Sequence, residues 1–326
     1  MLAAISMAVA SVADYYIPPC IDASARPERV LMAIECMRAL EGRLTGMPAA
    51  RDDLRDFLRQ EPDCILVQVT RAVGSTPRDT DAWMLVAKSR CFSTIGGGQL
   101  EYMAIDQARR TLRQSQPTTT MSIPLGPEIG QCCGGRVGLS FTPVTRDVAN
   151  ELIARTDAEM ARRPHVYVFG AGHVGDALAT ALSLAPLRTV LVDTRDDELA
   201  ASRASGIETC LTAMPEAIVR DAPAGSAFVI LTHDHALDFL IAAEALRRGD
   251  AAYVGMIGSK TKRATFKNWL THEVGSKELI DCLVCPIGGT AIKDKRPAVI
   301  ATLAAAEIMV AALSYHALAS TKKTVA

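Results

Sequence analysis

The sequence lacks an excess of charge of either sign, because 35 basic residues stand against 36 acidic ones, for a formal net charge of −1. This balance excludes the broad basic surface that attracts nucleic acid or an anionic membrane, so neither is expected as a partner. Internal repeats and low-complexity tracts are lacking as well. The 326 residues, 49% of them hydrophobic and 22% charged, suffice for two folded domains.

The chain also lacks the paired cysteine framework of a small secreted protein. Its nine cysteines are odd in number and irregularly spaced, which favours a reducing compartment. Residues 1–13 are apolar, but no Lys or Arg precedes Arg26, and the run is shorter than the ~20 residues of a membrane span. We therefore expect a cytoplasmic protein in which residues 1–46 are an extension upstream of the fold and Met47 is a candidate start; export is the alternative.

Residues 47–148 have the pattern of a small α+β domain, with strands and helices that do not alternate regularly. Apolar residues recur at helical spacing over 51–59 and again over 100–113. Strand-like runs lie at 64–70, 82–87, 92–95, 118–124 and 136–144. A polar segment at 147–163 is expected to be a helical connector.

Residues 160–326 alternate near-continuous apolar strands with helices, which predicts a parallel sheet covered on both faces. The strands are expected at 166–169, 189–193, 207–211, 227–231 and 252–257. Helices are expected at 174–184, 236–247 and 296–318, and another helix is expected to follow the last strand and to extend through Trp269.

A glycine-rich turn follows the first of these strands. Gly170, Gly172 and Gly175 form a GxGxxG pattern between a buried strand and a helix, and Asp193 ends the next strand. In a dinucleotide-binding unit the glycines allow a tight turn, close approach of a pyrophosphate and close packing of helix on strand, and the carboxylate accepts hydrogen bonds from a ribose diol. The sequence thus predicts an α/β fold: a Rossmann-like doubly wound parallel sheet in the C-terminal part, with a smaller N-terminal α+β domain. A turn without a ligand is the alternative.

Two further loops follow strands of the same sheet and are therefore expected to line its ligand crevice. Residues 232–235 read Thr-His-Asp-His, and residues 258–260 read Gly-Ser-Lys. His233 and His235 are types of residue that bind metal or transfer protons. Because no third ligand is evident, we favour the alternative that Asp234 caps the following helix.

Three loops of the N-terminal domain combine glycine with chemically active side chains. Residues 74–78 (GSTPR) carry Arg78, residues 96–101 (GGGQLE) place three glycines before a helix, and residues 130–135 (GQCCGG) set Cys132 and Cys133 among glycines. Glycines leave backbone N–H groups free to hold an anion and leave thiols accessible. We favour a functional role for this cysteine pair over a buried structural one.

Cys282 and Cys285 form a single CxxC pattern before Pro286. A zinc site needs four ligands, and combining this pair with Cys132 and Cys133 has no further support. Two partly buried cysteines on a strand are the favoured interpretation.

Taken in order, these motifs resemble those of the XdhC/CoxI family, the xanthine dehydrogenase accessory proteins. The matching strings are GSTPR, TIGGGQLE, GQCCGG, VFGAGHVG, LVDTR, THDHALD, GMIGSKTKR and CPIGG, and they extend across about Val67 to Gly289. The resemblance implies an accessory protein without catalytic activity of its own, usually a homodimer. Such a chaperone holds the molybdenum cofactor (molybdopterin) while a cysteine desulfurase adds sulfur, and delivers it to a molybdenum hydroxylase apoenzyme.

The resemblance also implies which residues contact the cofactor. Carried over by motif, they are Arg78, Gly97, Gly98, Glu101, Gln131, Cys132, Cys133, Gly170, Gly172, His173, Gly175 and Asp193. His233 and Ser259, in the two loops expected to line the crevice, are added as candidate contacts. Cys132 and Cys133 would ligate the molybdenum, since a soft metal accepts thiolate. The chain departs from the family where members commonly have Gly-Ala-Lys, because it reads Asp81-Ala82-Trp83.

Alternatives remain for the C-terminal site and for the function. NAD(P) or another nucleotide could occupy the glycine-rich loop instead of the pterin, which would fit an NAD(P)-dependent oxidoreductase with His233 or His235 as the acid–base group. A scaffold that holds no cofactor is a third possibility. The long apolar helix at 296–318, apolar on nearly every face over 298–309, is expected to be buried and to contribute to a homodimer.

Overall fold

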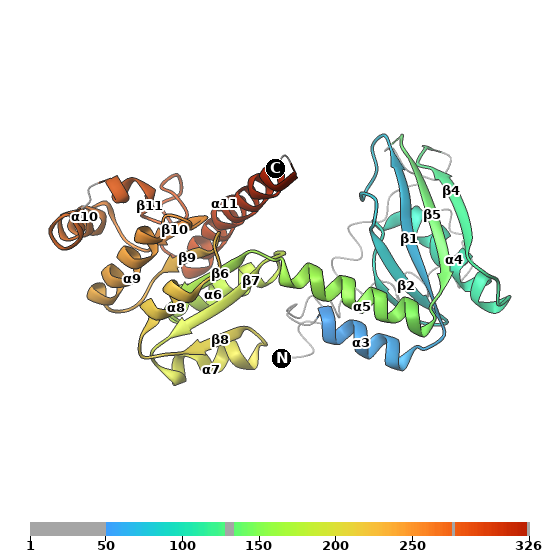
Figure 1. Ribbon diagram of the computed structural model, residues 1–326, viewed down its shortest axis with the longest axis horizontal. Helices are drawn as coiled ribbons and strands as arrows, with labels where there is room; N and C mark the ends of the chain where they lie inside the picture. Colours follow the sequence, from blue (N-terminus) through green and yellow to red (C-terminus); the bar gives the residue numbers. More distant parts are fainter. Residues whose placement is uncertain (1–49, 128–133, 276–277, 325–326) are drawn as a thin grey trace. The chain divides into compact units, whose positions relative to one another are not determined.

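The computed structural model describes residues 50–127, 134–275 and 278–324 (Figure 1). They form a five-stranded sheet in the N-terminal part and a six-stranded sheet in the C-terminal part. The predicted fold class, a Rossmann-like parallel sheet with a smaller N-terminal α+β domain, is confirmed. The expected extension at 1–46, the candidate start Met47, and the residues Gln131, Cys132 and Cys133 lie outside the described residues. The predicted domain limits stay a prediction.

The N-terminal sheet is antiparallel, with the strand order β3-β2-β1-β5-β4. Its strands are β1 (Cys64–Val73), β2 (Trp83–Ala87), β3 (Cys91–Ser93), β4 (Thr119–Pro124) and β5 (Arg136–Pro143). Three helices accompany it: α3 (Ala50–Gln60), α4 (Gly98–Arg113) and α5 (Arg146–Ala161).

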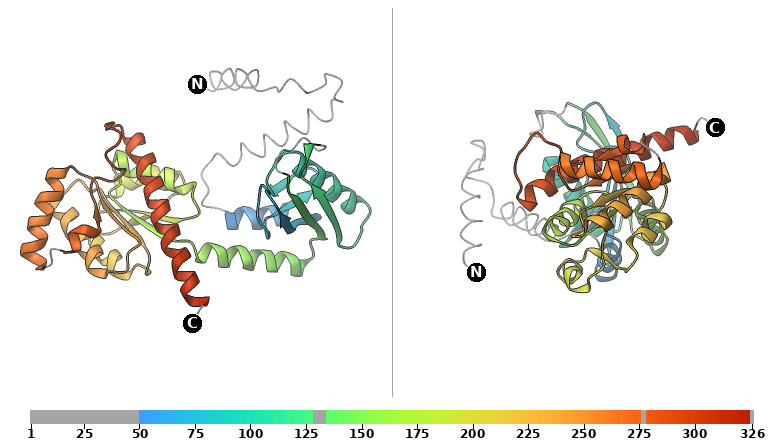
Figure 2. Two further views of the ribbon diagram at one scale, coloured as in Figure 1. Left: turned by 90° about the horizontal axis from the view of Figure 1, so that it is seen from above. Right: turned by 90° about the vertical axis from the view of Figure 1, so that its left-hand side faces the viewer.

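The alternation of side chains along the strands divides this sheet between two cores. Ile65, Val67 and Val69 of β1 point to the face that α4 covers, and Cys64 and Leu66 point to the face shared with α3 and α5. Figure 2 shows α4 on one side of the sheet and α3 and α5 on the other. A strand that buries both of its faces in this way is held at a fixed register.

Helix α5 confirms the predicted helix after residue 146, but it is more than a polar connector. Thr145 caps it by accepting a hydrogen bond from the Val148 N–H at 3.3 Å. Leu152 is buried against Leu54 and Phe57 of α3. Leu152, together with partly buried Ile153, therefore attaches α5 to the N-terminal core.

The C-terminal sheet is entirely parallel, with the strand order β11-β10-β9-β6-β7-β8. Its strands are β6 (His165–Phe169), β7 (Arg188–Asp193), β8 (Glu208–Leu211), β9 (Ala227–Ile230), β10 (Tyr253–Met256) and β11 (Leu283–Val284). The helices are α6 (His173–Ser183), α7 (Asp196–Ala204), α8 (Pro215–Asp221), α9 (His235–Arg248), α10 (Lys260–Val274) and α11 (Pro297–Thr324), and η2 (Glu278–Cys282) is a short 3₁₀ helix.

Helices cover both faces of the parallel sheet, as the apolar strands require. Helices α6, α7 and α11 pack on one face, and α8, α9 and α10 pack on the other. Helices α7 and α8 were not expected from the sequence. They are short, and each buries a single large apolar side chain, Leu199 and Val219 respectively, so neither has a marked helical period.

Helix α11 is apolar all round but buried on one face only. Ala301, Ala304, Ile308 and Ala312 pack into the core against α6, while Val310 is 65% exposed. The expectation of a helix buried on every side is therefore wrong for a single chain. Residues 297–318 are long and apolar enough to cross a membrane. The core helix of a water-soluble protein can have the same length and composition.

Candidate functional site

The strand order of the parallel sheet changes direction between β6 and β9, which lie side by side at its centre. From β6 the chain continues to β7 and β8 on one side, and from β9 to β10 and β11 on the other. Ligands of open α/β sheets bind at the carboxyl ends of strands at such a switch point. The glycine-rich loop after β6 and the loop after β9 meet there.

The first and third glycines of the loop have the packing roles expected of them, and the pyrophosphate contact expected at the second stays a prediction. A Cβ on Gly170 would lie 2.4 Å from the Leu231 carbonyl oxygen, and one on Gly175 would lie 1.9 Å from the Gly170 carbonyl oxygen. Any side chain at either position would collide with backbone. A Cβ on Gly172 would have no heavy atom within 4 Å, so the second glycine faces open space. This is the position at which a pyrophosphate approaches in the related nucleotide sites.

The N-terminus of α6 has no side-chain cap, in contrast to α9 and α10. Gly172 is its N-cap residue, and His173 is the first residue of the helix and is exposed. Asp234 caps α9, and Ser259 caps α10. The N–H groups in the first turn of α6 are therefore available to an anion.

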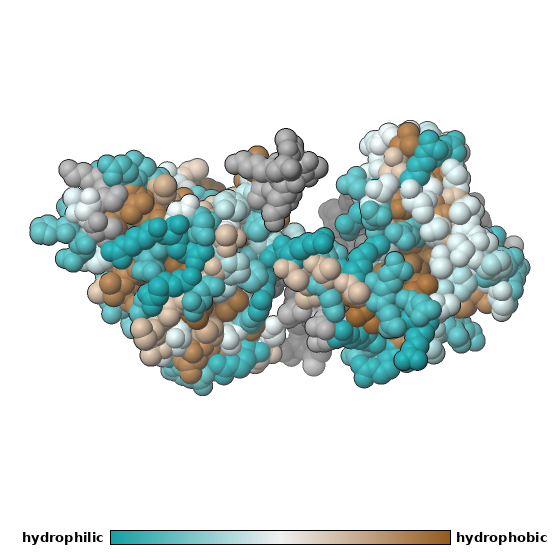
Figure 3. Space-filling view, in the orientation of Figure 1, coloured by the Kyte–Doolittle hydropathy of each residue, from teal (hydrophilic) through white to brown (hydrophobic). Residues whose placement is uncertain are grey.

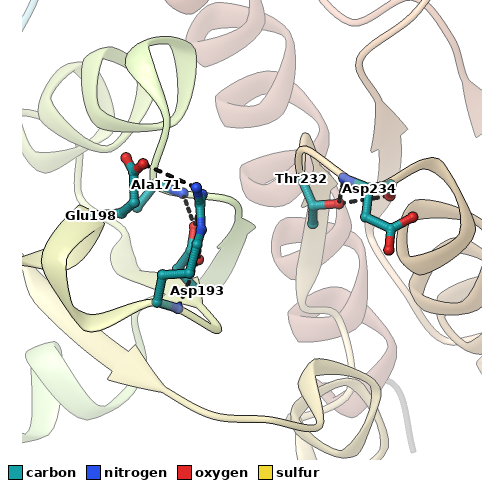
Figure 4. Close-up of polar contacts among 6 residues, drawn as sticks. Ala171, Asp193, Glu198, Thr232 and Asp234 are labelled. Atoms are coloured by element: carbon teal, nitrogen blue, oxygen red, sulfur yellow. Dashed lines mark hydrogen bonds and ion pairs between the residues drawn. The ribbon is translucent and has the colours of Figure 1, made fainter.

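Asp193 is buried at the end of β7 and holds the glycine-rich loop in place. Its carboxylate accepts hydrogen bonds from the Ala171 N–H at 2.7 Å and the Arg195 N–H at 3.0 Å. The Arg195 guanidinium donates to the same carboxylate at 3.1 and 3.2 Å and reaches Glu198 at 3.0 Å (Figure 4). These donors already engage both oxygens, so the predicted contact with a ribose diol would require some of them to leave; that role stays a prediction.

The surroundings of Asp193 also fix its charge. Burial by itself raises the pKa of the carboxyl group, but the hydrogen bonds from the Arg195 side chain and from the backbone N–H groups of Ala171 and Arg195 outweigh it. The pKa of Asp193 therefore lies below its ordinary value. At neutral pH the group is a carboxylate that anchors the loop.

The loop after β9 confirms the predicted helix cap. The Asp234 carboxylate accepts a hydrogen bond from the Ala236 N–H at 2.8 Å, and the Thr232 hydroxyl donates to the Asp234 carbonyl at 2.9 Å (Figure 4). His233 and His235 are exposed. Among the residues that the structure describes, no group of three His, Cys, Asp or Glu side chains could hold a metal ion.

A buried ion pair between α9 and α10 was missed by the sequence analysis. The Lys262 ammonium pairs with the Asp238 carboxylate, and the two side chains are 11% and 0% exposed. Asp238 also accepts the Thr232 N–H at 2.9 Å. Asp238 lies in the string THDHALD and Lys262 in the string GSKTKR. Nothing in either string separates these residues from charged side chains exposed to solvent, because their pairing depends on the packing of α9 against α10. The pair ties the loop after β9 to the helix that follows β10.

The segments that follow β10 and β11 contain Ser259 and Cys285, respectively. Ser259 caps α10 by accepting the Lys262 N–H at 3.3 Å, which is a structural role for a residue carried over as a cofactor contact. The Cys285 thiol lies 4.0 Å from the Ser259 carbonyl oxygen. Burial raises the pKa of Cys285, and nearby Lys262 and Arg263 offset this only in part. Cys282 is exposed at the end of η2, and Cys285 follows β11, so the expectation of two partly buried cysteines on a strand is wrong.

The glycine motifs of the N-terminal domain come together. Ser75 and Gly134 form a bridge between the first and third motifs, and a Cβ on Gly135 would lie 2.3 Å from the Ser75 carbonyl oxygen. A Cβ on Gly96 would lie 2.8 Å from the Pro77 side chain, which places the second motif against the first. We call residues 74–78, 94–98 and 134–135 the loop junction.

Glu101, in the first turn of α4, stabilises the glycine-rich loop that precedes this helix. Its carboxylate accepts hydrogen bonds from the Gly97 N–H at 3.0 Å, the Ile95 N–H at 3.2 Å and the Thr94 hydroxyl. These contacts hold the three-glycine turn at the start of α4, which has no other side-chain cap. Glu101 therefore shapes the turn, and its predicted contact with a cofactor stays a prediction.

Arg78 and the open glycines complete the described part of the junction. Arg78 is exposed and has no carboxylate partner among the described residues. A Cβ on Gly97 would have no heavy atom within 4 Å, and Gly98 opens α4 at a φ of 65°. Gln131, Cys132 and Cys133, the predicted ligands of the third motif, lie outside the described residues.

The departure at residues 81–83 has a structural counterpart. Asp81 has a φ of 73°, which lies in the left-handed region. The glycine common at this position in the family would adopt this φ without strain. Trp83 stacks on Phe92 at 6.0 Å between ring centroids, within the core shared with α3 and α5. The side chain at position 83 therefore belongs to that core.

Comparison with known proteins covers both domains. Residues 166–308 match the family model described as the XdhC Rossmann domain, and residues 57–123 match that of the XdhC and CoxI family. An Escherichia coli K12 protein named as uncharacterized protein YqeB is 26% identical over 263 residues, which cover 77% of this chain and 44% of that protein. The chain thus spans less than half the length of this relative.

A solved structure has the same fold. It is described as a xanthine dehydrogenase from Bacillus halodurans and is superimposable with a TM-score of 0.67 at 18% identity, covering 81% of this chain and 96% of that one. With both domains matched in order by models of one family, the chain belongs to the XdhC and CoxI family.

Proposed function

We propose that the protein binds the molybdenum cofactor, holds it while a cysteine desulfurase adds the terminal sulfur, and delivers it to a xanthine dehydrogenase-type molybdenum hydroxylase apoenzyme. Membership of the family suggests a role in xanthine dehydrogenase maturation and is consistent with an accessory role without catalysis. The observation that carries the proposal is the loop junction, where the glycine motifs meet next to Arg78, which has no carboxylate partner among the described residues.

The chemistry of the junction suits a pterin phosphate with a soft metal centre. Gly97 leaves room beside the N-terminus of α4, and Arg78 supplies a positive charge that no carboxylate of the described residues pairs with. Cys132 and Cys133, adjacent in sequence to the junction, would supply the thiolates that molybdenum accepts. The assignment of these residues to the cofactor belongs to the proposal.

The test is co-expression with the cofactor-synthesising machinery, followed by molybdenum analysis and fluorescence of the oxidised pterin. We expect about one cofactor for each chain. Cys132→Ser with Cys133→Ser should lower retention by about tenfold or more, which corresponds to ~1.4 kcal/mol, and activation of the client should fall with it. The matched control is Cys282→Ser, an exposed cysteine of the other domain. Background metal in a folded, fully supplied protein would refute the proposal.

An NAD(P)-dependent oxidoreductase is the alternative function. The four hydrogen bonds that the Asp193 carboxylate already accepts weigh against any nucleotide whose ribose needs this carboxylate, whatever the reaction. The homodimer implied by the family remains part of the proposal. The exposed apolar side chains of α11, Val310, Leu313 and Leu318, would then be covered by the second copy. A monomer mass by light scattering at micromolar concentration would contradict this part.

A further inference from the structure

Beside the loop junction, one face of the N-terminal sheet carries two arginines that have no acidic partner in the part of the chain that the structure describes. Arg71 on β1 and Arg136 on β5 are both exposed. No carboxylate pairs with either among the described residues. Arg136 directly follows Gly135 of the junction, and Arg71 lies three residues before Gly74.

The register of the strands places these arginines around a glycine. Gly138 of β5 is paired with Arg71 on one side and with Ser122 of β4 on the other. Arg136 is two residues from Gly138 along β5, so all four point to the same face. Cross-strand neighbours lie about 5 Å apart, and neighbours two residues apart along a strand about 7 Å, so both guanidinium groups can reach one ligand above Gly138.

A β-bulge brings Arg71 to this face. The register between β1 and β5 shifts between Val69 and Arg71, so Thr70 is an extra residue. Without the bulge Arg71 would point with Val69 into the buried core against α4. A Cβ on Gly138 would lie 3.3 Å from the Thr70 hydroxyl oxygen, so this hydroxyl also faces the space that glycine leaves.

The remaining groups at this place are also hydrogen-bond donors. The Arg136 guanidinium lies 3.4 Å from the Ser122 hydroxyl oxygen, which holds the arginine along the sheet. Figure 3 shows mostly pale and hydrophilic residues, with some hydrophobic ones, over the part of the N-terminal domain that holds β1, β4 and β5. Two guanidinium groups and two hydroxyls around an open glycine suit a doubly charged oxyanion.

We propose that Arg71 and Arg136, with the hydroxyls of Thr70 and Ser122, form a subsite for a phosphate monoester beside the loop junction. The assignment of this phosphate to the pterin cofactor rests on the proposed function. The subsite would hold the phosphate end of that molecule, and the junction would hold the remainder. Neither arginine belongs to the motifs that carry the family resemblance.

The first arm of the test uses inorganic phosphate with the full chain and no cofactor. Phosphate is titrated at constant ionic strength while the arginine Nε–H signals are followed by NMR. The signals of Arg71 and Arg136 should shift in a saturable way, and that of Arg113, an exposed arginine in the last turn of α4, should not. Arg71→Gln with Arg136→Gln should weaken phosphate binding by about tenfold or more, whereas Arg113→Gln should leave it unchanged.

Shifts no larger than that of Arg113, or unchanged phosphate affinity in the double variant, would overturn the subsite whatever the protein's function. The second arm measures molybdenum retention after co-expression. Lower retention in the double variant than in Arg113→Gln supports the cofactor as the source of the phosphate, and equal retention overturns that assignment. If even the wild-type protein retains no molybdenum, the proposed function fails, while the first arm still decides the subsite.

Discussion

Replacing Asp193 with asparagine tests whether this residue is an anchor of the glycine-rich loop. Asp193→Asn preserves the shape of the side chain but leaves only one oxygen as an acceptor. In the wild-type protein two oxygens serve the backbone N–H groups of Ala171 and Arg195 together with the Arg195 guanidinium. The new amide NH₂ must then face at least one of these donors.

The magnitude follows from the number of partners lost. A buried backbone N–H left facing a donor costs about 1–2 kcal/mol, and the loss of charge assistance in the pairing with Arg195 costs about 1 kcal/mol more. We discount the arginine contact because its side chain is 35% exposed and water can replace the carboxylate. The expected loss is about 2–3 kcal/mol, which lowers the unfolding temperature of a domain of this size by about 4–12 °C.

Thermal and urea unfolding at several pH values provide the assay. Because the pKa of Asp193 is lowered by folding, its stabilisation is complete above its ordinary pKa of about 3.9 and is lost as the pH falls through the lowered value. The difference between wild type and variant should therefore shrink below about pH 4. The control is Asp221→Asn, an exposed carboxylate at the end of α8, which should change stability by less than about 0.5 kcal/mol. Equal unfolding of the two variants at neutral pH, with nucleotide binding lost only in Asp193→Asn, would refute the anchor and favour the ribose contact.

Three other substitutions or reactions test separate features. Gly175→Ala should prevent stable folding of the parallel-sheet domain, because its Cβ would lie 1.9 Å from a backbone carbonyl oxygen, whereas Gly172→Ala should fold normally; circular dichroism and unfolding temperature distinguish them. Asp81→Gly should raise the unfolding free energy by about 0.5–1 kcal/mol, since glycine adopts the φ of 73° without strain, and an unchanged or lower urea midpoint would contradict this. At pH 7, iodoacetamide should modify exposed Cys282 well before half-buried Cys285, whose pKa is raised by burial, and mass spectrometry of peptides would expose the reverse order.

Local patterns predicted the elements of the fold well. The spacing of Gly170, Gly172 and Gly175 between an apolar strand and a helix encodes backbone geometry directly, so the tight glycine-rich turn was predicted from sequence. Asp234 was likewise recognisable as a helix cap from its place before the helix. Features of this kind depend on a few neighbouring residues.

Features that depend on contacts between distant segments were not predictable. The pairing of Asp238 with Lys262 joins two helices, and neither residue differs locally from a solvated charge. The bulge at Thr70 changes the face to which Arg71 points, although the alternating pattern alone places that arginine in the core. The use of Asp193 as a loop anchor was missed because it depends on how the loop folds back over the strand.

The packing of α11 against α6 has a consequence for how this protein can vary. Three of the four core positions of α11, Ala301, Ala304 and Ala312, are alanines, so the two helices approach without room for a larger side chain. Valine or leucine at these sites would push the helices apart, whereas exposed Val310 can be exchanged for a polar residue without disturbing the core. Sequence variation among relatives is therefore expected mainly on the exposed side of this helix, and the packed side should keep small residues.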